Sequence, residues 1–223
     1  MGWEQPGYVV AFTTRAGGVS DGVYASLNLT AGTGDDPERV AENRRRACGE
    51  LGLDASRLSF NRQVHSPTVH RAGGRGEPGD GLWSDEPGEP MLAFSADCLP
   101  IAIARLGAAR RLAVVHAGWR GLAEGVVAAA VDAVGGETAA AIGPAIGPCC
   151  YEVGEEVSAL FDDDLTMGRH LDLWTAAERA LRRAGVATVE RCDLCTRCHP
   201  ELFFSHRRSG RARGAQGVIG AVA

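Results

Sequence analysis

Short runs of apolar residues alternate along the chain with polar and glycine-rich stretches. Brief apolar runs that turn-forming residues interrupt are typical of buried strands. The pattern predicts strands over residues 9–13, 59–65, 91–95, 101–104, 112–115, 139–142, 186–189, 202–205 and 218–222.

Other stretches place apolar residues at the spacing of an amphipathic helix. Asp36 and Pro37 open the first of them as N-cap and first helical residue, and Gly52 closes it. Gly135 and Gly185 follow two later stretches and are typical helix stops. The spacing predicts helices over residues 37–51, 122–134, 155–160 and 171–184.

The strand at 112–115, the helix at 122–134 and the strand at 139–142 together predict a βαβ unit. His116 follows the first strand of this unit, at its carboxyl end. In open α/β sheets, ligands usually bind at that end. Since no repeat, linker or low-complexity tract interrupts the chain, we expect one α/β domain over residues 1–223.

The charge of the chain argues against a nucleic-acid partner. The formal net charge is −5, and the basic residues are scattered rather than gathered into a stripe. All 23 basic residues are arginine, so a P-loop lysine and Schiff-base chemistry are excluded. A bound phosphate would have to be held by arginine side chains or backbone N–H groups.

The sequence predicts a cytoplasmic protein without a membrane partner. It contains no run of about 18 apolar residues, and residues 1–6 lack the basic and apolar regions of a signal peptide. The seven cysteines are an odd number, and cytoplasmic conditions keep thiols reduced. Metal binding or catalysis is therefore favoured over a disulfide framework.

Three residues with metal-binding side chains lie at predicted strand ends: His65, Cys98 and His116. Two imidazoles and one thiolate suit a catalytic zinc whose fourth position is open to water. The alternative is a metal-free pair in which His116 lowers the pKa of Cys98 and makes it a nucleophile. The residue types leave both interpretations open.

Three cysteines near the C-terminus, Cys192, Cys195 and Cys198, form two overlapping Cys-x-x-Cys pairs. A structural zinc site needs four ligands, usually from two separate pairs. The sequence near this cluster offers no second pair, so we expect no complete zinc site there. We also expect Cys192 and Cys198 to be dispensable for activity.

Motifs along nearly the whole chain resemble the YfiH family, also called the laccase-domain or multicopper polyphenol oxidase family. Three of them together are highly specific: Gln63-Val64-His65, Ala96-Asp97-Cys98 and His116-Ala117-Gly118-Trp119-Arg120-Gly121. The others are Gly17-Gly18-Val19-Ser20, Ser26-Leu27-Asn28-Leu29, Gly34-Asp35-Asp36-Pro37, Asn43-Arg44, Gly143-Pro144, Cys150-Tyr151-Glu152-Val153-Gly154 and Phe203-Phe204-Ser205.

The resemblance implies a layered α/β fold of mixed sheets with packed helices, and a zinc held by His65, Cys98 and His116. It implies phosphorolysis of adenosine, inosine and methylthioadenosine, together with adenosine deamination. The older family name implies copper-dependent oxidation of phenols, but six histidines are too few for the copper centres of a laccase. Some relatives are described as hydrolases that edit cell-wall precursors, so a Cys-dependent hydrolase remains the alternative.

Within this resemblance, Cys98, His116 and the adjacent acid Asp97 are the catalytic candidates. The candidates for substrate binding are Arg44, Gln63 and Arg120. The arginines could hold phosphate, because a guanidinium binds oxyanions with two parallel hydrogen bonds. The expected partners are a purine nucleoside and phosphate, and the oligomeric state stays open. The chain departs from the family at Ser66, at Ser209 and at Ala212-Arg213-Gly214, where Thr-Gly-Arg is usual.

Overall fold

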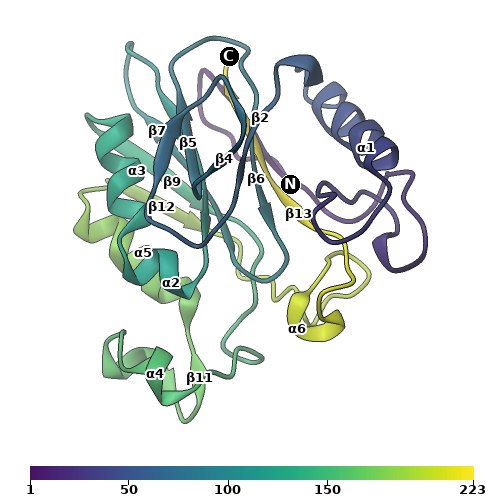
Figure 1. Ribbon diagram of the computed structural model, residues 1–223. Helices are drawn as coiled ribbons and strands as arrows, with labels where there is room; N and C mark the ends of the chain where they lie inside the picture. Colours follow the sequence, from purple (N-terminus) through teal and green to yellow (C-terminus); the bar gives the residue numbers. More distant parts are fainter.

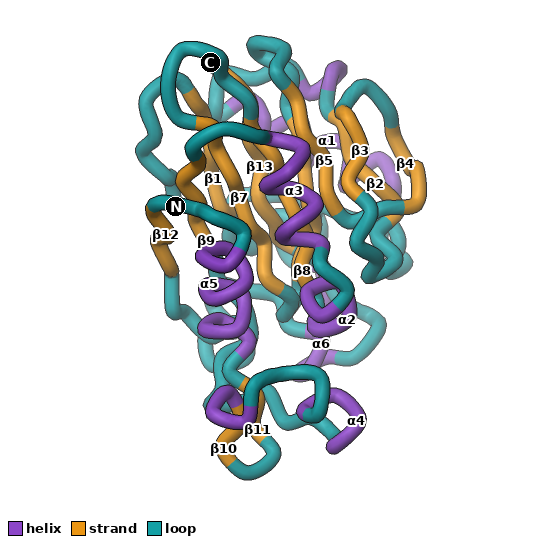
Figure 2. The backbone as a smooth tube through the Cα atoms, turned by 90° about the vertical axis from the view of Figure 1, so that its left-hand side faces the viewer, coloured by secondary structure: helices purple, strands orange, loops and turns teal.

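The computed structural model describes residues 1–223, which form two β-sheets packed face to face between layers of helices (Figure 1). Helix α1 (Pro37–Gly49) covers the outer face of one sheet. Helices α3 (Val126–Val134) and α5 (Leu173–Arg183) cover the outer face of the other sheet, as Figure 2 shows. This arrangement confirms the expected layered α/β fold of mixed sheets with packed helices.

The sheet next to α1 has five strands in the order β1-β13-β6-β2-β4. Strand β13 is antiparallel to both of its neighbours, whereas β2 is parallel to β6 and to β4. The strands are β1 (Tyr8–Phe12), β2 (Ser59–Arg62), β4 (Arg75–Pro78), β6 (Met91–Ser95) and β13 (Gln216–Val222).

The second sheet has six strands in the order β12-β9-β7-β8-β5-β3. Strand β7 lies between β8 and β9 and is antiparallel to both, so the predicted βαβ unit exists as a split unit. The strands are β3 (Val69–Arg71), β5 (Gly81–Ser84), β7 (Leu99–Arg105), β8 (Leu112–Ala117), β9 (Thr138–Ile142) and β12 (Thr188–Arg191).

Shorter elements connect these layers at the lower end of the molecule in Figure 1. They are the helices α2 (Trp119–Ala123), α4 (Glu155–Ser158) and α6 (His206–Ser209) and the strand pair β10 (Thr166–Met167) and β11 (His170–Leu171). Single 3₁₀ turns span Gly22–Tyr24, Ala55–Arg57 and Asp163–Leu165. No helix is long and apolar enough to cross a membrane.

The space between the two sheets is filled by apolar side chains from both of them. Val10 and Met91 from the five-stranded sheet pack against Leu112 and Val114 from the six-stranded sheet. A larger apolar cluster lies beneath α3 and α5 and includes Trp174. Because β8 is buried between these two clusters, the end of this strand is a fixed position on which chemistry can be built.

Helix α1 begins as predicted, because the Asp36 side chain accepts a hydrogen bond from the Glu38 N–H and Pro37 occupies the first turn. Asn43 on this helix is fully buried. Its side chain accepts from the Val19 N–H at 2.7 Å and donates to Ser20 Oγ at 2.9 Å. It also donates to the carbonyls of Ser26 and Asn28, so two family motifs near the N-terminus are tied to α1 by one buried polar network.

The predicted strand at 202–205 is wrong, although Phe203 and Phe204 are buried. The Phe203 N–H donates to the His199 carbonyl at 3.0 Å, and the other backbone groups are paired with side chains instead of a neighbouring strand. Gln216 accepts from the Phe204 N–H at 2.8 Å and donates to its carbonyl at 3.1 Å, and Arg208 donates to the Phe203 carbonyl at 2.6 Å. Since these bonds satisfy the buried polar groups, no sheet pairing is needed.

Candidate metal centre

The three residues predicted to bind metal come together in the structure. The ligand atoms of His65, Cys98 and His116 all lie within 4.8 Å of one another. Cys98 Sγ is 3.8 Å from His65 Nε2, and the two imidazole rings stand edge to face with centroids 4.8 Å apart. Three side chains from distant parts of the sequence therefore converge on one point.

Strand register explains this convergence. Because β7 runs antiparallel to β8, Pro100 lies opposite His116, and Cys98, just before β7, meets the end of β8. His65 comes from the other sheet, three residues after β2 ends at Arg62. His65 has a φ of +60°, and the chain then continues into β3 of the six-stranded sheet. The site thus lies where the ends of the two sheets meet.

Gly118, in the turn after β8, allows the three side chains to approach. A Cβ at this position would lie 2.6 Å from His65 Cδ2 and 3.1 Å from Cys98 Sγ. The first distance is far inside van der Waals contact, so any side chain here would displace His65. The glycine of the His-Ala-Gly-Trp-Arg-Gly motif is therefore a packing requirement of the site.

Asp80, which the sequence analysis missed, orients His116. It lies just before β5, and its Oδ1 is 2.8 Å from His116 Nδ1. Its Oδ2 accepts hydrogen bonds from the N–H groups of Val64 at 3.1 Å and Ser66 at 2.7 Å. Burial alone would raise the pKa of Asp80, but the bonds from His116 and Ser66 outweigh it and hold the pKa at about 2. The carboxylate thus joins the loop of His65 to the ring of His116.

Charges within the site favour a thiolate beside an imidazolium in the metal-free protein. Burial opposes ionisation of Cys98, yet His116 and His65 lower the pKa of this thiol to about 6. Burial also opposes protonation of His116, yet the Cys98 thiolate and Asp80 raise its pKa to about 9. The site therefore supplies a sulfur anion at neutral pH, as metal binding and nucleophilic catalysis both require.

The donor set fits a single metal ion. Asp80 is hydrogen-bonded to Nδ1 of His116, so Nε2 is left for a metal. Metal-binding histidines are commonly supported by a carboxylate in this way. Two imidazoles and one thiolate form a three-ligand set with an open position. The only other cluster of potential ligands contains cysteines alone, so the histidines needed for a trinuclear copper centre are absent.

Asp97, the predicted acid, is directed away from the three ligands and toward the C-terminal segment. Its Oδ1 accepts from Thr196 Oγ1 at 2.6 Å, and its Oδ2 accepts from the Arg207 N–H at 2.6 Å. It is buried and has a positive φ of 103°. These bonds make Asp97 an anchor for the segment that carries Arg207.

Arg44 and Gln63, the first two predicted substrate-binding residues, are engaged with the protein itself. Gln63 exchanges two hydrogen bonds with the backbone of Phe94, at 2.7 and 3.0 Å. Arg44 donates to the Leu29 carbonyl at 2.8 Å, and its guanidinium lies 4.1 Å from the centroid of the Phe60 ring. No hydrogen bond joins either side chain to the three ligands.

Arg120, the third of these predictions, is exposed, and its guanidinium lies 5.0 Å from the centroid of the Trp119 ring. It forms no salt bridge and is free to meet an anion. Helix α2 has only five residues, so its dipole adds little to anion binding. Arg120 would therefore attract an anion mainly through its own positive charge.

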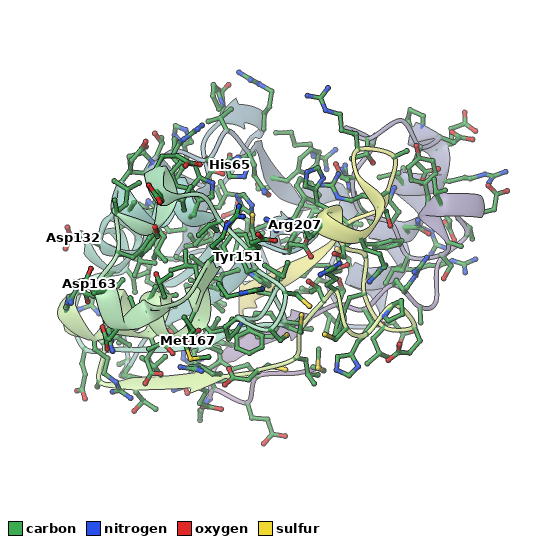
Figure 3. The ribbon with its side chains drawn as sticks, turned by 90° about the horizontal axis from the view of Figure 1, so that it is seen from below. His65, Asp132, Tyr151, Asp163, Met167 and Arg207 are labelled. Carbon is green, nitrogen blue, oxygen red and sulfur yellow. The ribbon has the colours of Figure 1, made fainter.

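Arg207, Tyr151 and Arg213 also lie near the ligands and were not singled out from the sequence. The Arg207 guanidinium is 5.4 Å from the centroid of the Tyr151 ring, and Figure 3 shows these side chains next to each other. Burial, and then the charge of Cys98, raise the pKa of Tyr151. Burial lowers the pKa of Arg213, whereas Asp97 and Cys98 raise it. Two arginines and a tyrosine thus border the site.

Asp80→Asn is expected to weaken metal binding by about 10- to 100-fold while the protein stays folded. The amide keeps the shape of the carboxylate but loses the charge that orients His116 and strengthens it as a ligand. A competition titration with a chelator would measure the affinity, and thermal unfolding of the metal-free protein would report on folding. An unchanged affinity would show that Asp80 serves only the fold.

Comparison with known proteins finds relatives along nearly the whole chain. A family model described as multi-copper polyphenol oxidoreductase laccase matches residues 9–222. A Pseudomonas aeruginosa protein named purine nucleoside phosphorylase PA4543 is 40% identical, over 94% of this chain and 92% of its own length. Purine nucleoside phosphorylase YfiH of Escherichia coli is 37% identical, over 92% of this chain and 91% of its own.

Solved structures show the same fold. The crystal structure of YlmD from Geobacillus stearothermophilus has a TM-score of 0.87 and 33% identity, covering 98% of this chain and 93% of that one. Neisseria meningitidis protein NMB0706 has a TM-score of 0.88 and 32% identity, covering 98% and 95%. The chain therefore belongs to the family described as multi-copper polyphenol oxidoreductase laccase, which includes the YfiH and YlmD proteins.

Proposed function

We propose that this chain is a zinc-dependent purine nucleoside phosphorylase that acts on adenosine, inosine and methylthioadenosine and also deaminates adenosine. The observation that carries the proposal is the convergence of His65, Cys98 and His116, with arginines beside them. The names of the relatives give the substrate class. Zinc is the metal that best suits two imidazoles, one thiolate and an open position.

In phosphorolysis the bond between ribose C1′ and purine N9 breaks and a bond from C1′ to a phosphate oxygen forms. The purine leaves with the bonding electron pair and takes up a proton. The phosphate needs positive charge near C1′, and we assign this role to Arg207, Arg213 and Arg120. Asp97 holds the backbone of Arg207 and is therefore a positioning residue for the phosphate.

Zinc held by His65, Cys98 and His116 would supply Lewis acidity that stabilises negative charge on the substrate. Tyr151 borders the same site, and its raised pKa keeps the phenol protonated at neutral pH. A protonated phenol can donate a hydrogen bond to the departing purine. The chain thus offers positive charge for the phosphate and a hydrogen-bond donor for the base.

The phosphate requirement tests the proposed reaction. We expect the zinc-loaded enzyme to convert inosine to hypoxanthine and ribose 1-phosphate only when phosphate is present, because phosphate is the nucleophile. Chromatography of both products, with and without phosphate, is the measurement. Adenosine should additionally yield inosine and ammonia without phosphate, since water is the nucleophile there. Release of free ribose at the same rate without phosphate would show that the enzyme is a hydrolase.

A Cys-dependent hydrolase remains the second candidate. Cys98 would be the nucleophile, His116 the base, and Asp80 the group that orients the base. This chemistry needs no metal, whereas the proposed phosphorylase does. Metal-free protein that cleaves amide or cell-wall substrates, and that loses this activity when Cys98 is alkylated, would favour the hydrolase.

A further inference from the structure

A second group of potential ligands lies apart from the three-ligand site and contains only cysteines. Cys149, Cys150, Cys195 and Cys198 have sulfurs that all lie within 4.8 Å of one another. Cys198 Sγ is 3.5 Å from Cys150 Sγ and 3.7 Å from Cys149 Sγ. The sequence-based expectation of an incomplete ligand set is therefore wrong, because the loop before α4 brings in the second pair.

The membership of this cysteine cluster also differs from the sequence pattern. Cys192 does not belong to it and lies instead 3.9 Å from the sulfur of Met1. Cys195 and Cys198 supply one Cys-x-x-Cys pair, and the adjacent Cys149 and Cys150 supply the other two sulfurs. Structural zinc sites usually take their four ligands as two pairs from separate loops, as here.

The sulfur spacing suits a tetrahedral metal site. Zinc–sulfur bonds of about 2.3 Å in a tetrahedron place the sulfurs about 3.8 Å apart. Two of the separations here, 3.5 and 3.7 Å, are close to that value. A disulfide joins only two sulfurs at about 2.05 Å, and all four of these cysteines are free. A disulfide would leave the convergence of the other two thiols without an explanation.

One backbone N–H binds a sulfur of the cysteine cluster, and other backbone bonds fix the two loops. The Gly147 N–H donates to Cys195 Sγ at 3.3 Å. The turn at Cys195 is closed by bonds from the N–H groups of Cys198 and His199 to the Cys195 carbonyl, at 3.1 and 3.2 Å. The Thr196 N–H donates to the Ala145 carbonyl at 3.1 Å and joins this turn to the opposite loop.

We propose that Cys149, Cys150, Cys195 and Cys198 bind a second, structural zinc ion as a tetrathiolate site. Four protein ligands complete the tetrahedron, so no position is left for substrate and the ion has no catalytic part. Binding replaces the four thiol protons with the metal, and these protons pass to solvent.

This zinc joins the two loops that border the candidate metal centre. The loop of Cys149 and Cys150 continues into Tyr151, and the turn of Cys195 contains Thr196, whose hydroxyl donates to Asp97 at 2.6 Å. The ion therefore holds Tyr151 and the Asp97 anchor in a fixed relation. The ion would affect the reaction only by fixing where Tyr151 and Asp97 lie.

Zinc analysis of purified variants tests this site without reference to activity, so it does not depend on the proposed function. We expect about two zinc ions per chain in the wild type and one in the double variant Cys149→Ser/Cys198→Ser. Cys192→Ser removes a nearby thiol outside the cysteine cluster and should keep both ions. Cys98→Ala should keep one ion, and adding the double substitution to it should leave none.

Cobalt provides a spectroscopic measurement on folded protein. In cobalt-loaded Cys98→Ala, sulfur-to-cobalt charge-transfer bands should be intense, because four thiolates remain at the cysteine cluster. Cys198→His keeps four ligands and should keep one bound cobalt with weaker bands. This conservative variant covers the case in which the double variant fails to fold.

Two results would overturn the proposal. The first is zinc content in folded Cys149→Ser/Cys198→Ser equal to that of the wild type. The second is a purified wild-type protein whose intact mass is lower by two hydrogens and whose peptides contain a disulfide within the cysteine cluster. Zinc release from the wild type during titration with a thiol reagent gives a check without any substitution, and four thiols should react for each ion released from this site.

Discussion

Replacing Cys98 by alanine is expected to lower kcat/KM for inosine phosphorolysis by at least about 10³-fold, a barrier increase of roughly 4 kcal/mol. The substitution removes one of the three ligands that converge within 4.8 Å, and the remaining pair of imidazoles binds zinc weakly. Without the ion, the site loses its Lewis acidity. Initial rates over a range of inosine concentrations, together with zinc analysis of the same sample, provide the measurement.

Two controls separate metal loss from other effects of this substitution. Cys192→Ser also removes one thiol, but it lies outside both ligand clusters and should retain wild-type activity. Wild-type enzyme stripped by a chelator should lose activity and regain it when zinc is added, whereas Cys98→Ala should not recover. Full activity of the stripped enzyme, lost only on alkylation of Cys98, would instead support metal-free nucleophilic catalysis.

The apolar runs in the sequence predicted the strands next to Cys98 and His116, and these two side chains meet His65 in the structure. His116 lies near the end of β8, which a continuous apolar run begins, and Cys98 lies between two such runs, β6 and β7. A strand end is a position that hydrophobic patterning can locate. Distance between the ligands could not be predicted in this way, because it depends on β7 lying antiparallel between β8 and β9.

Residues whose role depends on register or loop pairing escaped the sequence analysis. Asp80 acts through its bond to His116, which exists because β5 pairs with β8. Cys149 and Cys150 meet Cys195 because an isolated bridge joins Ala145 to Cys195. Neither pairing produces a local pattern in the chain, so the sequence contained no signal for either.

For some motif residues the sequence analysis expected a contact with substrate, whereas the structure shows contacts with the protein itself. Gln63 lies two residues before His65, but both ends of its amide bind the backbone of Phe94. Arg44 lies in another motif, but its side chain donates to the Leu29 carbonyl and packs against the Phe60 ring. A motif marks residues needed by the fold and residues needed by the chemistry alike, and only the contacts distinguish them.

Arg207→Gln is expected to raise the apparent KM for phosphate by about 10² or more and to leave the KM for inosine within a few fold. The Arg207 guanidinium lies beside Tyr151, and its backbone N–H is held by Asp97, so its charge is fixed at the edge of the site. With no lysine in the chain, arginine supplies the permanent positive charge that phosphate needs. Glutamine keeps a donor for the Glu152 carbonyl, which Arg207 binds at 2.8 Å. Initial rates over a phosphate series at saturating inosine are the measurement.

Two further arginine variants test this assignment of the phosphate site. Arg169→Gln removes an exposed charge that pairs with Glu152, and it should leave the KM for phosphate unchanged. Arg120→Gln removes the free charge at the start of α2. We expect a change in the same direction as Arg207→Gln but smaller, because the Glu152 carbonyl holds the Arg207 guanidinium, whereas no hydrogen bond or salt bridge holds that of Arg120. If Arg120→Gln instead gives the large increase and Arg207→Gln gives none, phosphate binds beside α2, and the bond between Asp97 and Arg207 serves the fold alone.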